Sequence, residues 1–400
     1  TLSKALGADL VVWNRVYTPE GIKRGEAMRN ALDELQIKHR SFNSQLLLEP
    51  SNVLNKQGTP FKVFTPFWRH CRCFLAPQSA PKLSVFATQS SDSSAALGSN
   101  ARSLEELNLA PSNPDWALGF SDFWTPGEAG AQTQWQDFLD DNVDDYGDAR
   151  DFPALGKTSG LSPHLAWGEI SPEQIFADCS EAIDSGQADA ANANKFLSEI
   201  GWREFCSYLL CHFPHLPERA FNNKFDAFPW QQNQGYLNAW QTGQTGYPIV
   251  DAGMRELWHS GYMHNRVRMI VASFLTKHLL LDWREGAEWF WDTLLDADLA
   301  NNTAGWQWAA GCGADAAPYF RIFNPILQGQ KFDKRGEYVR RWVPELATIP
   351  DKWLYTPWQA PDDILEQSNV VLGSNYPKPI VDHKQARELA LSTYQQMKAG

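Results

Sequence analysis

The most informative run of the sequence is Asp296-Ala-Asp-Leu-Ala-Asn-Asn-Thr-Ala-Gly-Trp-Gln-Trp308. It places two carboxylates, two adjacent asparagines and two indoles within thirteen residues. Burying Asp296 and Asp298 without partners would cost on the order of several kcal/mol, so the fold must supply hydrogen-bond donors or a positive charge. The stretch therefore predicts a polar site inside a packed domain rather than a plain apolar core.

The segment Tyr262–Phe274 reads as the start of a helix that supplies this partner. Apolar residues recur at helical spacing along one face, namely Val267, Ile270, Val271, Phe274 and Leu275. Asn265, Arg268 and Met269 share another face, because residues three and four apart are neighbours on a helix. We expect Arg268 to be the buried cation that faces Asp296.

Length and composition bound the kind of protein. The chain has 400 residues. A single hydrophobic core usually supports fewer residues than that, so two domains are expected. The formal net charge of −12 argues against non-specific affinity for polyanions but leaves room for a local basic groove. Most of the 18 Trp residues are expected to fill the core. The 6 Cys residues form no CxxC pair, which indicates reduced thiols, and no apolar run reaches the roughly 18 residues of a membrane span.

The first part of the chain alternates short apolar strands with a helix. Asp9–Trp13 and Ile37–Phe42 read as strands and Glu20–Leu35 as the helix between them, which indicates a parallel α/β layer. From Ala76 to about Gly130 the composition shifts to Ser, Pro, Gly and Asn, which is typical of a long surface connection. Beyond Gln132 the pattern is helical. The predicted organisation is an α/β layer over 1–72, a linker over 73–130 and an all-α domain over 131–400.

Several polar motifs have two readings on the residues alone. Thr158-Ser-Gly-Leu-Ser162 before Pro163 resembles a pyrophosphate loop, although an ordinary helix N-cap is the more frequent meaning of Ser-Pro. Glu199, Trp202 and Arg203 share a helical face, as a surface ion pair beside a core indole would. Trp230, Trp283 and Trp306 are each more typical of core. The basic run Arg321–Arg341 is usually solvated charge.

A resemblance decides between these readings. The runs YMHNRVRMIVASFLTKHLLLDWREG (residues 262–286) and DLANNTAGWQWAAGCGADAAPYFRIFNP (residues 298–325) are very similar to the photolyase/cryptochrome family, most of all to bacterial class I photolyases for cyclobutane dimers. The similarity extends from about Tyr146 to Glu345 and more weakly to the N-terminus. The family's Asp-Leu-Arg-Leu signature is not found, so only the second half of its N-terminal α/β domain is expected here.

The resemblance implies an FAD site in the helical domain. The matching cofactor positions are Tyr146, Thr158, Ser159, Gly160, Leu161, Ser162, Arg268, Asp296, Ala297, Asp298 and Asn302. Asn302 aligns with the residue beside flavin N5, where plant-type cryptochromes usually carry Asp. Trp306, Trp283 and Trp230 match the family's electron-transfer chain to the flavin. A second antenna chromophore (folate, deazaflavin or flavin) is compatible with the resemblance, but its site is expected to be incomplete.

The resemblance also implies a DNA substrate. Glu199, in protonated form, would hydrogen-bond a damaged pyrimidine pair, and Trp202 would form one wall of its pocket. The matching contact positions are Arg150, Trp202, Arg203, Asn265, Arg266, Met269, Trp308, Arg321, Gln328 and Lys331. Enzymes for (6-4) photoproducts carry His at positions 265 and 269, which favours the cyclobutane substrate. Tyr262 replaces a Trp common in relatives.

The resulting hypothesis is light-driven repair of cyclobutane pyrimidine dimers in ultraviolet-damaged DNA, by electron transfer from photoexcited reduced FAD to a flipped-out dimer. The alternative is a cryptochrome-type FAD blue-light receptor without repair activity. A cytoplasmic monomer, in the bacterial cytosol or nucleoid, is expected, with no metal and no membrane partner.

Overall fold

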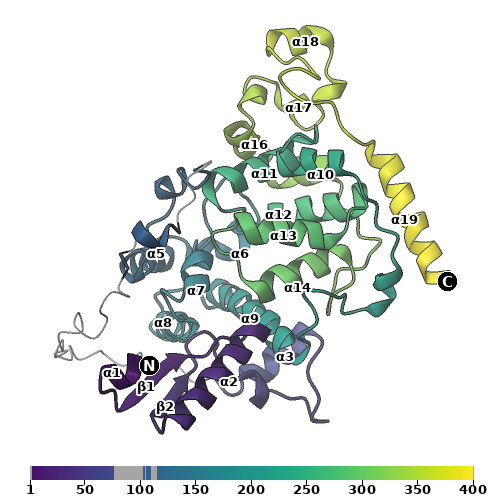
Figure 1. The fold of residues 1–400 in the computed structure, drawn as a ribbon. Coiled ribbons are helices and arrows are strands. Elements are labelled where there is room, and N and C mark those ends of the chain that lie inside the picture. The colour runs from purple at the N-terminus through teal and green to yellow at the C-terminus, as the bar shows by residue number, and fades with distance from the viewer. Residues whose placement is uncertain (1, 76–101, 104, 110–114, 400) are drawn as a thin grey trace.

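The computed structural model describes residues 2–75, 102–103, 105–109 and 115–399. Within these residues the chain is mostly helical and carries a single small sheet at the N-terminal end (Figure 1). Much of the predicted linker, residues 76–101, 104 and 110–114, lies outside the described residues, and the division into domains stays a prediction. None of the helices in the described part is both long and apolar enough to cross a bilayer.

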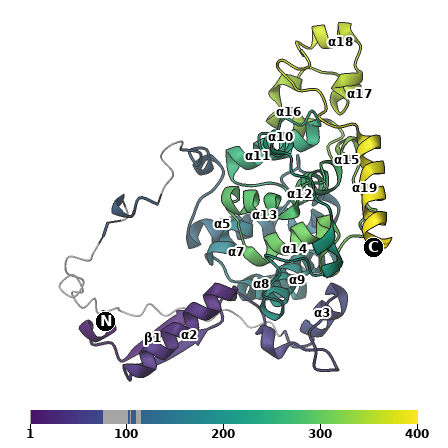
Figure 2. The same ribbon diagram turned by 45° about the vertical axis from the view of Figure 1, so that its right-hand side comes forward.

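The N-terminal layer contains α1 (Leu2–Ala5), β1 (Leu10–Asn14), α2 (Pro19–Glu34) and β2 (Lys38–Phe42). The two strands are parallel, as the sequence predicts, and their register pairs Leu10 with Lys38. A helix joins them because parallel strands need a crossover connection. The Thr18 side chain accepts from the Gly21 N–H and so begins α2. Figure 2 shows this layer at one end of the helical body.

The remaining elements are helical and follow in chain order. They are η1 (Pro50–Asn52), α3 (Phe64–Cys71), η3 (Glu105–Leu107), η4 (Phe120–Asp122), α5 (Glu128–Asp141), η5 (Val143–Asp145), α6 (Tyr146–Ala149), α7 (Ser162–Trp167), α8 (Pro172–Asp184), α9 (Ala190–His212), η6 (Asn223–Ala227), α10 (Gln234–Gln241), α11 (Pro248–Ser260), α12 (Asn265–Ser273), the π-helix η7 (Phe274–His278), α13 (Trp283–Thr293), α14 (Leu299–Ala310), α15 (Pro325–Phe332), α16 (Glu337–Trp342), η8 (Pro344–Leu346), α17 (Asp351–Leu354), η9 (Pro357–Gln359), α18 (Asp362–Gln367) and α19 (His383–Ala399).

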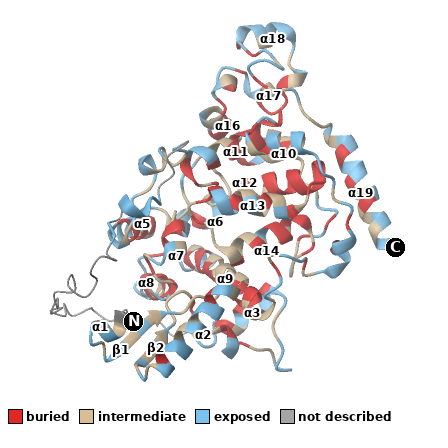
Figure 3. Ribbon diagram, viewed as in Figure 1, coloured by how far each residue is buried: buried red, intermediate tan, exposed pale blue. Residues whose placement is uncertain are grey.

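Two apolar cores lie under these helices (Figure 3). The first is built from α3, α5, α8 and α9, and the second from α10 to α19. Helices α9 and α14 pack against each other and so join the two. The predicted stripe of α12 is confirmed, since Val267, Ile270 and Val271 are buried while Asn265 is exposed. All 6 cysteines are free thiols.

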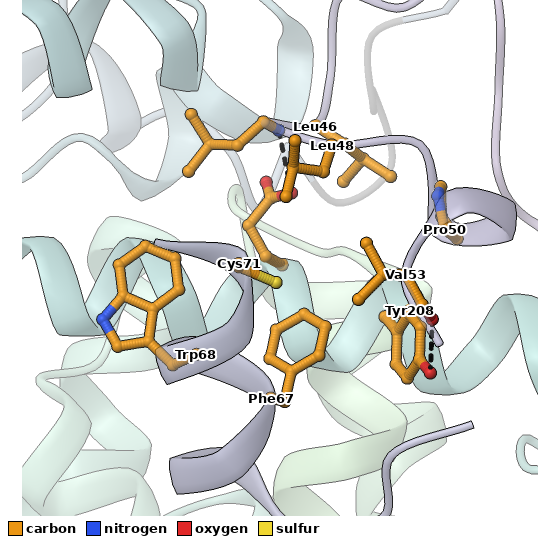
Figure 4. Close-up of a pocket in the computed structure, with 10 residues that line it drawn as sticks. Leu46, Leu48, Pro50, Val53, Phe67, Trp68, Cys71 and Tyr208 are labelled. Carbon is orange, nitrogen blue, oxygen red and sulfur yellow. Dashed lines mark hydrogen bonds between the residues drawn. The ribbon is translucent and has the colours of Figure 1, made fainter. Parts of the chain in front are cut away.

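The seam between the N-terminal segment and α9 contains a buried carboxyl group. The Glu204 Oε2 atom accepts the Leu47 N–H at 2.8 Å, while the buried Oε1 atom accepts no hydrogen bond and lies 3.5 Å from Arg203 Nη1. Beside it lies a cavity with room for no more than about one water, where Trp68 and Cys71 face Leu46 across the gap (Figure 4). Burial raises the pKa of Glu204 from 4.5 to about 7, against the opposing charge of the adjacent arginine.

Replacing Glu204 with glutamine is expected to stabilise the protein at pH 8 and to change little near pH 4.5. Between pH 4.5 and 7 the folded chain keeps a proton that the unfolded chain has released, so stability falls as pH rises through 7. The full effect is roughly 3 kcal/mol. Urea unfolding of both proteins at the two pH values measures it, and parallel pH profiles would contradict the assignment.

Candidate functional site

The predicted pair of Arg268 and Asp296 is confirmed. Arg268 Nη2 lies 2.7 Å from Asp296 Oδ2, and Arg268 Nε donates to the Met263 carbonyl at 2.6 Å. Burial lowers the pKa of Arg268, but Asp296 outweighs it and the net pKa is raised. The helix α12 thus presents a fixed cation to the loop that precedes α14.

Asp296 keeps one acceptor free. Asp296 is 8% exposed, and its Oδ1 atom has no hydrogen-bond partner among the described residues. A buried acceptor left unpaired costs about 1–3 kcal/mol, so an N–H or O–H from a ligand is expected there. The imide N–H of a flavin ring is a donor of the required kind, and the residues present therefore fit FAD.

The other polar residues of the opening stretch have structural partners. Asp298 caps α14 by accepting the Asn301 N–H at 2.8 Å. The Asn302 amide donates to the Ala287 carbonyl of α13 at 2.8 Å. Asn302 is therefore oriented toward α13 and, among the described residues, makes no hydrogen bond to the ion pair. Ala297, between Asp296 and Asp298 in the sequence, is half-buried. The flavin contacts expected of Ala297, Asp298 and Asn302 stay predictions.

The Thr158–Ser162 loop is not an ordinary helix cap. The N-cap of α7 is Leu161, no side chain caps the helix, and Ser162 is already its first residue. Gly160 has φ of 64°, in the left-handed region that favours glycine. The Ser159 carbonyl accepts a hydrogen bond from Gln134 Nε2 at 2.9 Å, which fixes the loop. The Ser162 hydroxyl makes no hydrogen bond to a described residue.

Tyr262 lies beside both this loop and the ion pair. Burial raises the pKa of its phenol, which Arg268 and the Thr158 side chain oppose, and the Arg268 guanidinium carbon lies 5.4 Å from its ring centroid. The residue that departs from the family pattern therefore lies next to two of the predicted cofactor segments.

Glu199 forms an ion pair with Arg150 and not with Arg203, its neighbour on the same helix. Its carboxylate forms an ion pair with Arg150 of the α6 end, whose guanidinium also lies 5.2 Å from the centroid of the buried Tyr146 ring. Arg203 instead donates to the carbonyls of Gln45 and Leu165. The reading of Glu199 and Arg203 as a pair is wrong, because α9 turns Arg203 toward the seam.

The two predicted stacking walls are half-buried. Trp202 lies parallel to Phe64, with ring centroids 3.9 Å apart, so one face of its indole is already covered. Trp308, on α14, packs against the second core. Both have area left for a base, but no ring contact joins the two indoles among the described residues. Their convergence on one pocket stays a prediction.

The N-terminal end of α12 carries the predicted DNA contacts. Asn265 is exposed and Met269 half-buried. Arg266 forms an ion pair with Asp151 at 2.7 Å and lies over the Phe332 ring at 4.4 Å. Farther along, Arg321 and Lys331 are exposed, and Gln328 has a buried Oε1 without a partner. These residues leave cationic groups at the surface next to α12.

Two residues here escaped the sequence analysis. His264 caps α12 through Nδ1, which accepts the Arg266 N–H at 3.1 Å, while burial lowers its pKa to about 4. Glu256 accepts from the Tyr338 hydroxyl, and burial raises its pKa to about 7. The signal for His264 was its place between the aligned Met263 and Asn265. Glu256 had no such signal, because its partner lies far away in sequence.

The three tryptophans predicted as an electron chain lie around the start of α13. The Trp306 ring covers Gly286, one turn after Trp283 on the same helix. The Gln231 N–H bonds to the Leu280 carbonyl, which brings Trp230 to the segment just before α13. Trp283 and Trp306 are buried and Trp230 is half-buried, so the set runs from the interior toward the surface.

Replacing Gly286 with alanine is expected to lower the free energy of unfolding by about 1–3 kcal/mol. The new Cβ atom would lie 2.1 Å from Trp306 Cη2, so the indole must move. Gly305→Ala is the matched control, since a Cβ there meets nothing within 4 Å. Thermal and urea unfolding compare the two variants. Equal stabilities would show that Trp306 does not lie on Gly286.

The protein combines a small α/β layer with a helical domain, and the helical domain contains a buried ion pair with one unpaired acceptor atom. The family model described as "DNA photolyase" matches residues 1–82, and that described as "FAD binding domain of DNA photolyase" matches residues 196–396. The chain belongs to the DNA photolyase/cryptochrome family, as the sequence resemblance indicates.

Individual relatives agree with this family. A deoxyribodipyrimidine photo-lyase of Agrobacterium fabrum is 51% identical over 98% of this chain and 80% of its own length. Cryptochrome-1 of Arabidopsis thaliana is 38% identical over 99% of this chain and 59% of its own length. The crystal structure of a bacterial class III photolyase from Agrobacterium tumefaciens superposes with a TM-score of 0.92, at 49% identity, over 100% of this chain and 81% of that one. Because this similar protein is a class III photolyase, the narrower class I expectation is not taken further.

Proposed function

We propose that this protein is a light-driven deoxyribodipyrimidine photo-lyase that repairs cyclobutane pyrimidine dimers. The enzyme class is supported by relatives of that name, one of them 51% identical. The observation that carries the site is the buried Arg268–Asp296 pair with its unpaired Oδ1 atom, inside the FAD-binding domain. When bound, reduced FAD supplies the photochemistry, giving an electron to the dimer and taking it back.

The protein's own residues would hold and orient this cofactor. The Asp296 Oδ1 atom would accept a ring N–H, and the ion pair with Arg268 fixes the direction of that carboxylate. The Thr158–Ser162 loop would offer hydroxyls and backbone N–H groups to the pyrophosphate. Asn302, whose amide nitrogen donates to the Ala287 carbonyl, would offer the ring an amide but no acid proton, as proposed for a repair enzyme.

To enter the proposed pocket, the pyrimidine dimer would have to flip out of the DNA duplex. A fused dimer is poorly stacked and paired, so its extrusion costs only a few kcal/mol, and this difference supplies selectivity. The free faces of Trp202 and Trp308 would stack on the extruded bases, each worth about 1–3 kcal/mol. Arg266, Arg321 and Lys331 would contact phosphates, so affinity should weaken as salt rises.

The Arg150–Glu199 ion pair would couple phosphate binding by Arg150 to the release of the Glu199 carboxyl group. An ion-paired carboxylate accepts hydrogen bonds, whereas the proposed role of Glu199 requires it to donate. A DNA phosphate that recruits Arg150 would remove its partner from Glu199. Once released from Arg150, the Glu199 carboxyl group would face the dimer and, in the protonated form that the resemblance implies, donate to a pyrimidine carbonyl.

A blue-light receptor without repair activity is the second candidate. Its support is the 38% identity to Cryptochrome-1. Asn302, Glu199 and Met269 favour repair, because the resemblance places these residue types in repair enzymes.

Counting dimers in ultraviolet-treated DNA, incubated with the FAD-loaded protein in light and in dark, separates the two. We expect dimers to disappear only in light. Equal counts under both conditions, with FAD shown by absorbance to be bound, would reject repair and leave the receptor. The same sample analysed for a second pigment would settle the antenna chromophore.

A further inference from the structure

A charged side chain lies deep in the second core, where the proposed mechanism does not use it. Lys277 is 1% exposed and belongs to the π-helix η7. It continues the apolar stripe of α12, ten residues after Val267 and three after Phe274, so a helix of this register directs it inward. Burying an ammonium group is costly, which implies that its contacts matter.

Those contacts all lead to one loop. Lys277 Nζ donates to the Arg321 carbonyl at 3.0 Å and lies 5.3 Å from the centroid of the Tyr319 ring. One helical turn earlier, the Ser273 hydroxyl accepts the Phe323 N–H at 3.3 Å. Two hydrogen bonds from the α12–η7 segment therefore fix the backbone of residues 319–323, which connects α14 to α15. We name these residues the 319–323 loop.

We propose that Lys277 is a positioning residue that holds the 319–323 loop so that Arg321 faces DNA. The inference rests on the proposed function, in which Arg321 contacts phosphate. Arg321 is exposed and forms no ion pair with any described residue, so its direction depends on the backbone that carries it. Lys277 itself is too deeply buried to touch DNA.

The groups that face Lys277 are few in the described part of the chain. They are the Tyr319 phenol ring, the Cys312 thiol, the Arg321 guanidinium and the neighbouring His278, which is hydrogen-bonded to His383 of α19 at 2.8 Å. Burial lowers the pKa of Lys277 to about 7. The charged donor is therefore present below pH 7 and is lost as pH rises through it, and the loop should loosen in the same direction.

Amide hydrogen exchange of peptides covering residues 318–324 tests the tether in the ligand-free protein. Lys277→Met keeps the length of the side chain but removes the donor and the charge. We expect roughly tenfold faster exchange of the loop, the scale of one lost buried hydrogen bond. Thr276→Val is the matched control, because that hydroxyl bonds only to Ala272 within the helix. Unchanged loop exchange in a folded Lys277→Met protein overturns the proposal.

Two further measurements keep the test decisive. In the unaltered chain, protection of residues 318–324 should fall between pH 6 and 8.5, relative to peptides of α14 and after correction for intrinsic rates; constant protection overturns the proposal even if the Met variant does not fold. A duplex containing one cyclobutane thymine dimer should bind Lys277→Met roughly tenfold more weakly at pH 6.5. If the loop loosens but the unaltered protein ignores this duplex, the tether stands and the proposed function fails.

Discussion

Replacing Asp296 with asparagine should lower the free energy of unfolding by about 3 kcal/mol and abolish FAD retention. The change leaves the Arg268 guanidinium in a mostly buried position without its counter-charge, and breaking a buried pair costs about 3–5 kcal/mol. Urea unfolding of the FAD-free proteins at pH 7 measures the first effect. Flavin absorbance after gel filtration with excess FAD measures the second.

Asp292→Asn is the control for this prediction. Asp292 is exposed on α13 and makes no ion pair with a described residue, so its replacement should change neither stability nor flavin content. If Asp296→Asn behaved like this control in both measurements, the ion pair would not be part of a cofactor site.

Replacing Trp308 with alanine should weaken binding of dimer-containing DNA by about 10- to 100-fold, because stacking on an indole is worth roughly 1–3 kcal/mol per base. Binding of an undamaged duplex should change little, since phosphate contacts dominate there. A titration with a fluorescent duplex, with and without a single dimer, gives both affinities.

Trp291→Ala serves as the comparison for Trp308. Trp291 is 51% exposed on α13 and lies outside the proposed pocket, so its loss should leave the preference for damaged DNA intact. An equal loss of affinity for damaged and undamaged duplexes in Trp308→Ala would place this indole outside the dimer pocket.

The strands β1 and β2 and the helix α2 were predicted within one residue at each end, from the alternation of short apolar strands with a helix. The helix α12 was predicted from its apolar spacing, but it begins at Asn265, three residues later than expected. These signals depend on neighbours in the sequence. The cap of α7 was predicted less well, because a Ser-Pro pair does not reveal whether Ser162 or the residue before it leaves the helical conformation.

Within the site, the pair of Arg268 and Asp296 was predictable because a buried carboxylate demands a cation and one helix offered it. The partner of Glu199 was not predictable, since Arg150 lies 49 residues away and only tertiary packing brings α6 to α9. The π-helix around Lys277 was missed for a related reason. Its extra residue per turn depends on how η7 packs between α14 and α19, and local propensity carries no sign of it.

The central claim is that a flavin lies beneath an opening that receives extruded bases. Its most direct test is the absorption spectrum of the FAD-loaded protein during titration with an oligonucleotide carrying one cyclobutane dimer, beside the undamaged strand of the same sequence. A dimer that displaces water from the ring should shift the flavin bands, saturating at one equivalent, while the undamaged strand leaves them in place. Identical spectra with both strands, at concentrations where the damaged one is bound, would contradict this arrangement.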